Sequence, residues 1–317
     1  MWRTEKSVHH GGTEGTENKI KRKNNKITGW QDGQDGLIQR PTMSLSSSIC
    51  DPLRYLRFNL LFAVLFGFFA VLPLAAQPAP KLLPGEGLAI AGEDGQVQGF
   101  GEAQREAPMG SLAKLVWLRL EGDDWASQSV RFNCTGTWEG HTCWNREGHK
   151  KVDLAKALDQ SCNLAFLAWI RESAARWERI DGPGVARYRL EEVFGPFLGG
   201  RMPAGEGIPA FGPEWIGDGD LLRTSPEAFL AWLLDPAQEG LMRRWRKLAL
   251  GFLDGVTSTQ AWWMKTGTGP VPGAPGETCA WVAGSNGKVT AVLRLPRGRG
   301  RVDGLARFRD VLGLPAK

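Results

Sequence analysis

The strand signals of this chain lie at its two ends, and a long helical middle separates them. Residues 88–91 and 96–100 flank Glu93-Asp94-Gly95, and Asp-Gly is a turn pair typical of a β-hairpin. Further strands are predicted at 260–268, 278–283 and 289–295, followed by a helix at 302–312. The sequence therefore predicts an α/β protein of the α+β kind: an antiparallel sheet built from both chain ends, with an inserted helical subdomain.

Helical periodicity and capping residues occupy the middle of the chain. Residues 152–177 carry apolar side chains at helical spacing, but Ser161 and Asn163 interrupt the pattern, so we expect two helices or a break there. Ser225 followed by Pro226 predicts a helix N-terminus. The other expectations are a helix that begins near residue 111, loops at 122–151, loops with one short helix near 190–197 within 182–219, and a helix at 241–253.

The first 76 residues lack the signals of a folded domain. Residues 1–42 are polar and predict either a disordered extension or a wrongly assigned start codon, with Met43 as the alternative start. Residues 43–76 combine a basic flank, a short apolar run and small residues, which predicts a signal peptide or an uncleaved N-terminal anchor. Residues 77–87 read as a linker, so the domain is expected at 88–317. We therefore expect an exported protein, periplasmic or on the outer face of the cytoplasmic membrane.

The positive charge of the chain is concentrated in the same N-terminal part. The formal net charge is +5, of which residues 1–42 carry +3 and residues 43–76 carry +1. The predicted domain is therefore almost neutral. It lacks the electrostatic signature of a nucleic-acid-binding protein, so we expect no nucleic-acid partner. Contact with a membrane is expected only through an uncleaved N-terminal segment.

Ser111 and Lys114 form the first of three short motifs that carry chemistry. They are three residues apart at a predicted helix start, so their side chains share one face of the helix. A lysine placed there takes the serine proton once its own charge is suppressed, and backbone N–H groups at the helix start receive an oxyanion. This is the pattern of an activated serine nucleophile. An N-cap serine followed by a surface lysine gives the same pair without chemistry.

Two later motifs favour the chemical interpretation. Ser161-Cys162-Asn163 lies in the interrupted helix, and Lys265-Thr266-Gly267-Thr268 ends an aromatic strand. Taken singly, the first is explained by a helix bend and the second by a strand end and turn. The order Ser-x-x-Lys, Ser-x-Asn, Lys-Thr-Gly, however, is that of penicillin-binding proteins and serine β-lactamases. The chain thus resembles the penicillin-recognising serine transpeptidases. The resemblance implies their β-lactamase/transpeptidase-like fold over most of residues 85–315.

The resemblance also implies a catalytic role for three residues. Ser111 would attack the carbonyl of a D-alanyl-D-alanine stem peptide, or of a β-lactam that imitates it. Lys114 would act as general base, which requires a lowered pKa. Ser161 would relay the proton to the leaving nitrogen. This chemistry requires no cofactor, and the expected partners are peptidoglycan stem peptides and β-lactams.

The implied substrate-binding residues come from the second and third motifs. Asn163 would bond the substrate amide, while Lys265 and Thr266 would bind its terminal carboxylate. Gly267 would let the strand backbone approach the substrate, and the N–H groups of Ser111 and Thr268 would form the oxyanion hole. A further stretch from Gly217-Asp218-Gly219 to Thr224-Ser225-Pro226 resembles a Gly-Gln-Gly…Thr-Pro segment of transpeptidases.

Several activities stay open at this point. A D,D-transpeptidase or carboxypeptidase is expected first, because none of Glu191, Glu192 and Glu206 is marked as a deacylating base. A class D-like serine β-lactamase or a β-lactam sensor is the alternative, although class D enzymes usually carry a hydrophobic residue where Asn163 stands. A non-catalytic envelope-binding module is the alternative from another class.

The cysteines allow two kinds of structural link. In an exported protein the default is a disulfide, and Cys134 with Cys143 would close a short loop. The spacing of Cys134, Cys143, His149 and Cys162 also fits three thiolates and one imidazole around a structural zinc ion, with His141 as a rival ligand. A similar run of cysteines and histidine occurs in some transpeptidases. Zinc, the disulfide and free thiols all stay open.

Overall fold

The computed structural model describes residues 79–127, 131–200, 212–250, 258–259 and 262–314. These residues belong to one compact unit, Val71–Lys317. The predicted N-terminal extension and the export segment lie outside the described residues. Among the described helices, none has the length and apolar character that crossing a membrane requires.

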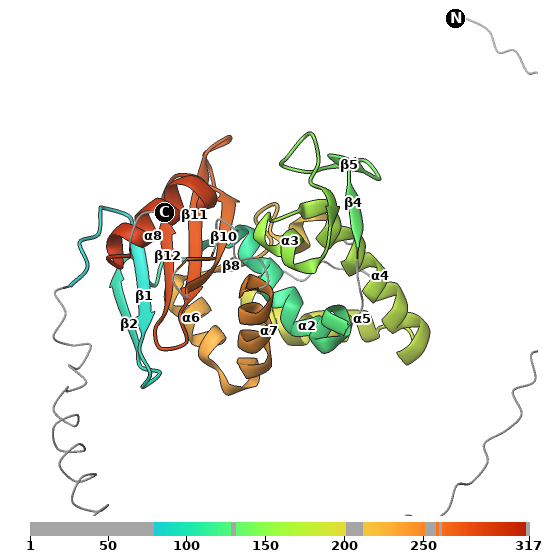
Figure 1. The fold of residues 1–317 in the computed structure, drawn as a ribbon, viewed down its shortest axis with the longest axis horizontal. Coiled ribbons are helices and arrows are strands. Elements are labelled where there is room, and N and C mark those ends of the chain that lie inside the picture. Colours follow the sequence, from blue (N-terminus) through green and yellow to red (C-terminus); the bar gives the residue numbers. More distant parts are fainter. Residues whose placement is uncertain (1–78, 128–130, 201–211, 251–257, 260–261, 315–317) are drawn as a thin grey trace, which may run out of the picture. The chain divides into compact units, whose positions relative to one another are not determined.

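The main sheet has six strands in the order β2-β1-β12-β11-β10-β9 (Figure 1). Its N-terminal strands are β1 (Gly87–Ala91) and β2 (Val97–Gly101). Its C-terminal strands are β9 (Ser258–Thr259), β10 (Trp262–Pro270), β11 (Thr278–Ser285) and β12 (Thr290–Leu295). All neighbours are antiparallel, and β1 joins the two groups because it pairs with β12. The predicted sheet from both chain ends is confirmed.

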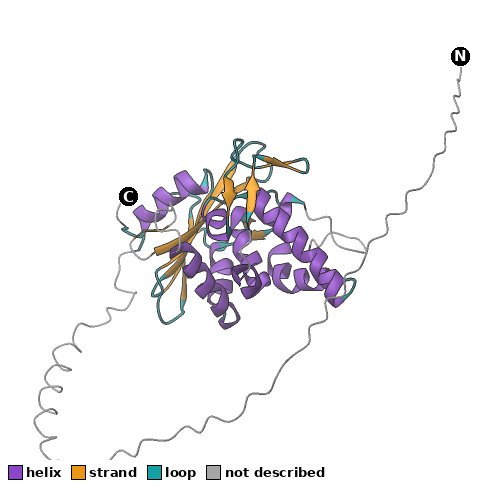
Figure 2. Cartoon of the chain, turned by 45° about the vertical axis from the view of Figure 1, so that its right-hand side comes forward, coloured by secondary structure: helices purple, strands orange, loops and turns teal. Residues whose placement is uncertain are grey.

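Successive tryptophans of β10 divide the core between the two faces of this sheet. The ring of Trp262 lies 5.9 Å from that of Phe308 in α8 (Leu305–Val311). The ring of Trp263 lies on the opposite face, 6.4 Å from that of Trp245 in α7 (Glu239–Leu250). Side chains alternate along a strand, so a strand that is apolar on both faces must be covered on both. In Figure 2, helices accordingly lie on either side of the strands.

The inserted segment forms the helical subdomain, and α2 (Ala113–Ser127) is its central helix. α2 follows the short turn η2 (Gly110–Leu112). Its buried Trp117 donates a hydrogen bond of 2.7 Å from Nε1 to the carbonyl oxygen of Trp215 in η3 (Pro213–Ile216). The other helices here are α3 (Leu154–Asp159), α4 (Asn163–Asp181), α5 (Val185–Leu198), α6 (Pro226–Leu234) and the turn η4 (Pro236–Gln238).

The helix boundaries agree with the sequence at some points and differ at others. The break between α3 and α4 lies at Ser161, as predicted. Ser225 caps α6, and its Oγ accepts a hydrogen bond of 3.2 Å from the N–H of Ala228. α2, however, continues past Gly122, because one glycine costs a helix only about 1 kcal/mol and packing against α5 and α7 outweighs it. Packing likewise makes α5 longer than the short helix expected near residues 190–197.

The predicted loop at 122–151 contains short strands instead of irregular chain alone. They form two two-stranded ladders: β4 (Phe132–Cys134) pairs with β7 (Lys150–Val152), and β5 (Thr137–Trp138) pairs with β6 (His141–Thr142). A third ladder, outside this segment, pairs β3 (Ala107–Pro108) with β8 (Arg223–Thr224). The β4–β7 ladder holds the base of this segment beside the start of α4.

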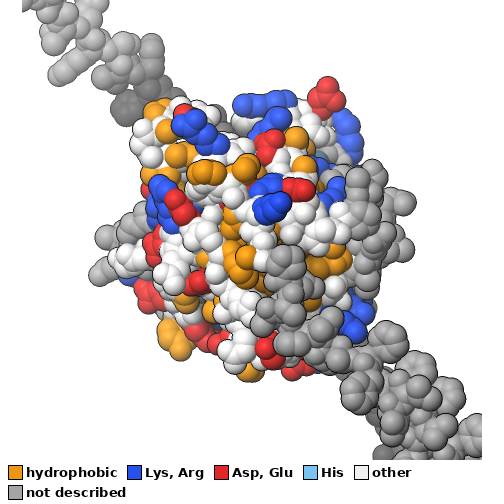
Figure 3. Space-filling model, turned by 90° about the vertical axis from the view of Figure 1, so that its left-hand side faces the viewer, with side chains coloured by type: hydrophobic (Ala, Val, Ile, Leu, Met, Phe, Trp, Pro, Cys, Tyr) orange, Lys and Arg blue, Asp and Glu red, His pale blue; other side chains and the backbone are white. Residues whose placement is uncertain are grey.

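Charges of both signs are mixed on the side of the molecule that Figure 3 shows. Next to the N-terminal strands, Arg105 Nη1 lies 2.8 Å from Glu102 Oε2, and Lys288 Nζ lies 4.0 Å from Glu93 Oε1. This mixture agrees with the nearly neutral charge of the domain.

Candidate active site

Ser111 lies in the turn that begins the central helix, directly against strand β10. Gly110 before it has a φ of +55°, and a Cβ added there would lie 2.6 Å from backbone atoms of Thr268. Only glycine lets the turn approach the strand so closely. Ser111 itself is partly exposed and lines a cavity. The fold thus places the predicted nucleophile beside the predicted Lys-Thr-Gly strand.

Lys114 lies one helical turn further on and is completely buried. Its Nζ donates hydrogen bonds of 2.8 Å to Ser111 Oγ and of 2.8 Å to Asn163 Oδ1. The ring centroid of Phe166 is 5.7 Å from the same nitrogen. Burial lowers the pKa of Lys114 from 10.5 to about 8, although the charges of nearby thiols act in the opposite direction. A lysine with this pKa is partly neutral near pH 7 and can accept the Ser111 proton.

Ser161 forms the tight connection between α3 and α4. Its φ of +50° lies in the left-handed region, which few residues other than glycine adopt. Its Oγ accepts a hydrogen bond from Lys265 Nζ. Its carbonyl oxygen accepts one of 3.2 Å from the indole Nε1 of Trp144. Contacts on both sides therefore hold the turn in a conformation in which Ser161 lines the cavity.

Lys265 is almost fully buried in β10, and its charge lies behind the cavity wall. Besides Ser161, its Nζ bonds the carbonyl oxygen of Thr266 at 2.7 Å. Burial first, and then the charge of Lys114, lowers the pKa of Lys265 well below 10.5. The two buried amines thus each hold one of the two serines.

The remaining motif residues continue along β10. A Cβ on Gly267 would lie 2.7 Å from the carbonyl oxygen of Met109, so the glycine permits the close contact between β10 and the Ser111 turn. The next residue, Thr268, is exposed to the cavity. Its Oγ1 accepts a hydrogen bond of 2.9 Å from the N–H of Gly300, at the start of η5 (Gly300–Gly304). The C-terminal segment is thereby fixed to the same wall.

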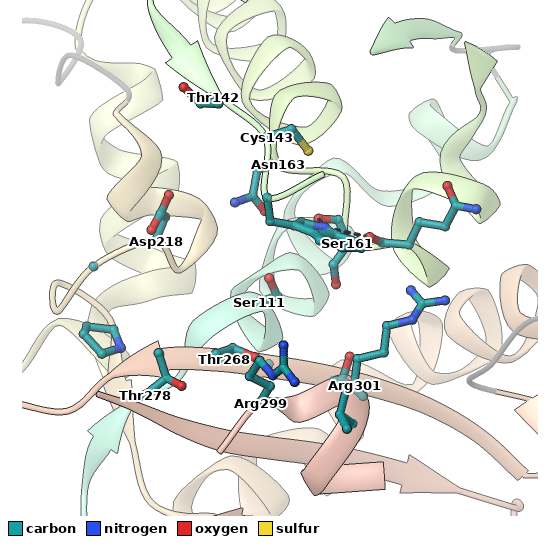
Figure 4. A pocket seen from close by; sticks show the side chains of 18 of the residues that line it. Ser111, Thr142, Cys143, Ser161, Asn163, Asp218, Thr268, Thr278, Arg299 and Arg301 are labelled. Carbon is teal, nitrogen blue, oxygen red and sulfur yellow. Dashed lines mark hydrogen bonds between the residues drawn. The ribbon is translucent and has the colours of Figure 1, made fainter. Parts of the chain in front are cut away.

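These groups surround one cavity of about 690 Å³, which Figure 4 shows at close range. This volume is within the range of pockets that bind small ligands. The predicted residues that line it are Ser111, Ser161, Asn163, Thr266, Gly267 and Thr268. Lys114 and Lys265 lie beneath them and bond to two of them. The structure therefore brings all of the predicted catalytic and substrate-binding residues together.

Three thiols and one imidazole meet on the other side of the Ser161 turn. Cys134, Cys143, His149 and Cys162 are all buried, and their ligand atoms lie within 4.8 Å of one another. His149 Nδ1 is 3.6 Å from Cys134 Sγ and 3.5 Å from Cys143 Sγ. The disulfide expected as an alternative is not formed, because Cys134 and Cys143 are both free. His141, the rival ligand, instead lies 2.9 Å from Nη2 of Arg171.

The donor set of this thiol cluster fits a zinc ion. Zn–S bonds of ~2.3 Å in a tetrahedral site place the donor atoms about 3.5–3.8 Å apart, close to the two measured separations. The hydrogen bond between the Cys143 and Cys162 thiols lowers the pKa of Cys143, whereas the same bond, followed by burial, raises the pKa of Cys162, so one proton is shared between the two thiols. Zinc needs ionised thiols. The cluster reaches the site in two ways: Cys143 lines the cavity, and Cys162 separates Ser161 from Asn163 in the chain.

No protein-family model and no curated protein sequence matches the chain. Its structure, however, superposes on penicillin-binding protein PBP2 of Pseudomonas aeruginosa, solved in complex with WCK 5153. The TM-score is 0.50 at 13% sequence identity, over 72% of this chain and 70% of that chain. The chain has the fold of the penicillin-recognising serine enzymes.

Two further solved structures are similar to this chain. PBP2 of Helicobacter pylori gives a TM-score of 0.49 at 12% identity, over 71% of this chain and 59% of that chain. FUS-1, a class D β-lactamase of Fusobacterium nucleatum, gives 0.48 at 11% identity, over 72% of this chain and 89% of that chain.

Sequence reasoning missed the charged residues that line the cavity of this fold. They are Arg146, Asp218, Glu277, Arg299 and Arg301. The run Arg297-Gly298-Arg299-Gly300-Arg301 after the last strand was a visible signal, since arginines repeated at that spacing are unusual in a turn. Asp218 stands where the transpeptidase segment that it resembles has glutamine. Neither position follows from a motif, because the topology alone brings these loops to Ser111.

The three glutamates considered as deacylating bases do not contribute to the cavity in the described chain. Glu191 and Glu192 are exposed on α5 and do not line it. Glu206 lies outside the described residues. The cavity carboxylates are Asp218 and Glu277 instead.

Proposed function

We propose that this protein is a penicillin-binding serine acyltransferase that acts on D-alanyl-D-alanine ends of peptidoglycan stem peptides through an acyl-enzyme on Ser111. The observation that carries the proposal is the contact between Ser111 and Lys114. A fully buried amine with a pKa of about 8 lies 2.8 Å from a serine hydroxyl that lines a cavity. A lysine that serves only as a surface charge has no reason to be buried there.

The proposed acylation uses the side chains and backbone N–H groups of the residues that surround the cavity. Neutral Lys114 takes the proton of Ser111 Oγ, and the oxygen attacks the carbonyl carbon of the substrate. The N–H groups of Ser111 and Thr268 stabilise the oxyanion. When the carbon–nitrogen bond breaks, Ser161 relays the proton held on Lys114 to the leaving nitrogen, and the Lys114 amine becomes neutral again. Asn163, whose Oδ1 is bonded to Lys114, has its amide NH₂ left for the substrate amide.

Charge on the Lys-Thr-Gly side supports binding of the terminal carboxylate. Thr266 and Thr268 offer hydroxyl groups to the cavity, and Lys265 adds positive charge from behind them. Arg299 and Arg301 line the cavity on the same side of Ser111 (Figure 4). A carboxylate that enters here meets hydroxyl donors and cations together.

Covalent labelling with a fluorescent penicillin tests this function. Wild-type protein should be labelled on Ser111, and Ser111→Ala should not be labelled at all. Ser225→Ala is the matched control, because this serine caps α6 outside the cavity, and its labelling should persist. Equal labelling of Ser111→Ala and wild type contradicts the proposal, and an absence of labelling in wild type favours a non-catalytic envelope-binding module.

A class D-like β-lactamase or a β-lactam sensor is the second candidate. Burial of Lys114 supports it, since a neutral buried lysine is also what carboxylation by carbon dioxide requires. Turnover separates the candidates. A transpeptidase without a deacylating base keeps its acyl group for many minutes, whereas a β-lactamase hydrolyses a chromogenic cephalosporin in rapid multiple turnovers.

We also propose that Cys134, Cys143, His149 and Cys162 hold a structural zinc ion. Its chemistry would be limited to fixing the loop between β4 and β7 to the start of α4, because none of the predicted catalytic residues belongs to the cluster. Catalysis requires no cofactor in this proposal. Export across the cytoplasmic membrane is a further proposal, supported by the basic and apolar pattern of residues 43–76. Cell fractionation with sequencing of the mature N-terminus would test it.

A further inference from the structure

Helix α3 ends at the cavity, and side chains from distant segments bind the carbonyl groups at this end. Trp144 Nε1 donates hydrogen bonds of 3.0 Å to the carbonyl oxygen of Gln160 and of 3.2 Å to that of Ser161. Arg301 Nη1 donates one of 3.3 Å to the carbonyl oxygen of Asp159. The last carbonyl groups of a helix lack partners within it, so they need such donors. Both donor residues line the cavity together with Gln160 and Ser161.

Trp144 makes its two bonds although 56% of the residue is exposed. Its ring packs on one side only, where its centroid lies 5.2 Å from that of His149 in an edge-on arrangement. Burial of apolar surface therefore explains only part of what the ring does here. The indole N–H, which a phenyl ring lacks, is the group that reaches the end of α3.

The bond to the Ser161 carbonyl oxygen acts on a residue whose backbone is unfavourable. A φ of +50° costs a serine free energy, and it persists only where surrounding contacts hold it. Trp144 holds the carbonyl group of Ser161, and Lys265 Nζ donates a hydrogen bond to its Oγ. Because the lysine is the donor in that bond, the hydroxyl proton of Ser161 stays available to another acceptor in the cavity.

We propose that Trp144 is a positioning residue for proton delivery: its N–H fixes the Ser161 turn so that the Ser161 hydroxyl meets the nitrogen of the breaking bond. This inference rests on the proposed function, in which Ser161 relays a proton from Lys114. As the carbon–nitrogen bond breaks, the nitrogen keeps the bonding electron pair and takes the Ser161 proton, and Ser161 regains a proton from Lys114. Trp144 exchanges no proton and acts only through Ser161.

A matched pair of substrates separates proton delivery from the rest of acylation. In an N-acylated D-alanyl-D-alanine, the leaving atom is an amide nitrogen. In the matching thioester with D-thiolactate, the leaving atom is sulfur. The nitrogen leaves only when it receives a proton, whereas a thiol has a pKa of about 8.5 and leaves as a thiolate. A fault in proton delivery should therefore slow the amide and spare the thioester.

The variant Trp144→Phe keeps an aromatic ring beside His149 and removes the N–H. With enzyme in excess, single-turnover release of D-alanine should be about tenfold slower than in wild type, as expected for one lost hydrogen bond. Release of the thiol should change by less than about twofold. Both rates are measured on one preparation, so a smaller folded fraction cancels in their ratio. Trp138→Phe is the control and should keep the wild-type ratio, because Trp138 lies in the same segment but does not line the cavity.

The variant Ser161→Ala tests whether Trp144 acts through Ser161. In wild type, the change Trp144→Phe removes the support of a working hydroxyl. In the Ser161→Ala background that hydroxyl is already gone, so adding Trp144→Phe should slow D-alanine release by less than about twofold further. A side chain that merely stabilises the loop would instead slow both backgrounds by the same factor.

The outcomes separate this inference from the function on which it rests. If wild type releases neither D-alanine nor the thiol, the proposed function fails. If wild type releases both and Trp144→Phe slows both alike, or slows D-alanine release equally in the Ser161→Ala background, the function stands and the positioning role is overturned. A loss confined to the amide substrate, and absent from the Ser161→Ala background, supports the inference.

Discussion

Lys114 is completely buried, and its amine forms hydrogen bonds with two polar atoms that have different roles. Ser111 Oγ is the group that it would activate in the proposed mechanism, and Asn163 Oδ1 is a neutral acceptor that orients the amine without adding charge. A carboxylate in the place of Asn163 would keep the lysine protonated, because an opposite charge favours the charged form. In the proposed mechanism, the Ser-x-Asn motif therefore orients the general base in addition to binding the substrate.

The rate of acylation should depend on pH through Lys114. The pKa is lowered to about 8, so the neutral form that acts as base is scarce below this pH and predominates above it. The second-order rate constant for benzylpenicillin should rise about tenfold per pH unit up to pH ~8 and then level off. Stopped-flow labelling from pH 5.5 to 9.5 would measure this. A profile that still rises at pH 9.5 would mean that burial does not suppress the charge of Lys114.

At the scale of elements, the turn between α3 and α4 joins the thiol cluster to the catalytic site. Cys162 is the N-cap residue of α4, and its side chain makes no capping hydrogen bond. Its neighbours in the chain, Ser161 and Asn163, both line the cavity. Whatever holds the Cys162 thiol therefore also fixes the direction of these two side chains. Trp144, beside Cys143, adds a second link through its bond to the Ser161 carbonyl oxygen.

Zinc removal should accordingly affect stability and acylation together. Protein purified without chelator should contain about one zinc ion per chain, and Cys162→Ser should lose it. Chelation should lower the melting temperature by about 10 °C and slow penicillin acylation, since binding only to the folded state stabilises it. Cys279→Ser is the control, because Cys279 is buried in β11 outside the cluster, and its zinc content should not change. A zinc-free protein with a Cys134–Cys143 disulfide in mass spectrometry would contradict the metal site.

Local signals predicted the elements that depend on neighbouring residues. Asp94-Gly95 predicted the β1–β2 hairpin, and Ser225-Pro226 predicted the start of α6, because each contains its own turn or cap. Gly122 was misleading, since the packing that keeps α2 helical comes from distant helices. The segment around Asp218 resembles a transpeptidase segment, but no role for the Asp218 side chain was predicted, because it becomes part of the cavity only through the contact of its loop with the distant Gly110.

At the scale of the whole molecule, an ion pair reinforces the sheet that joins the two chain ends. Arg307 Nε on α8 lies 2.9 Å from Glu86 Oε1, just before β1, and Nη2 lies 2.9 Å from Glu86 Oε2. The same guanidinium donates a hydrogen bond of 2.6 Å to the carbonyl oxygen of Lys81. Glu86 is only 4% exposed and has a third donor in the N–H of Leu83 at 2.7 Å. This cluster ties the start of the domain to its last helix.

Arg307→Ala should therefore lower the free energy of unfolding by about 2–3 kcal/mol, because it leaves the buried Glu86 carboxylate without its cation. Urea denaturation followed by tryptophan fluorescence would measure the change. Arg243→Ala is the matched control, since its partner Glu239 is exposed on the same helix, and the loss there should stay below about 0.5 kcal/mol. Equal losses in the two variants would show that the chain ends are not held by this pair.

Because the sheet contains strands from both ends of the chain, it also determines when the proposed active site can form during synthesis. Ser111 and Lys114 emerge from the ribosome early and meet within one helical turn, but the wall that encloses the lysine includes β10 from the last quarter of the chain. Glu86 must wait for a partner 221 residues later. Until then the amine is open to water and keeps its charge. If Ser111 is the nucleophile that we propose, an unfinished chain carries it in an inactive form until the final strands close the sheet.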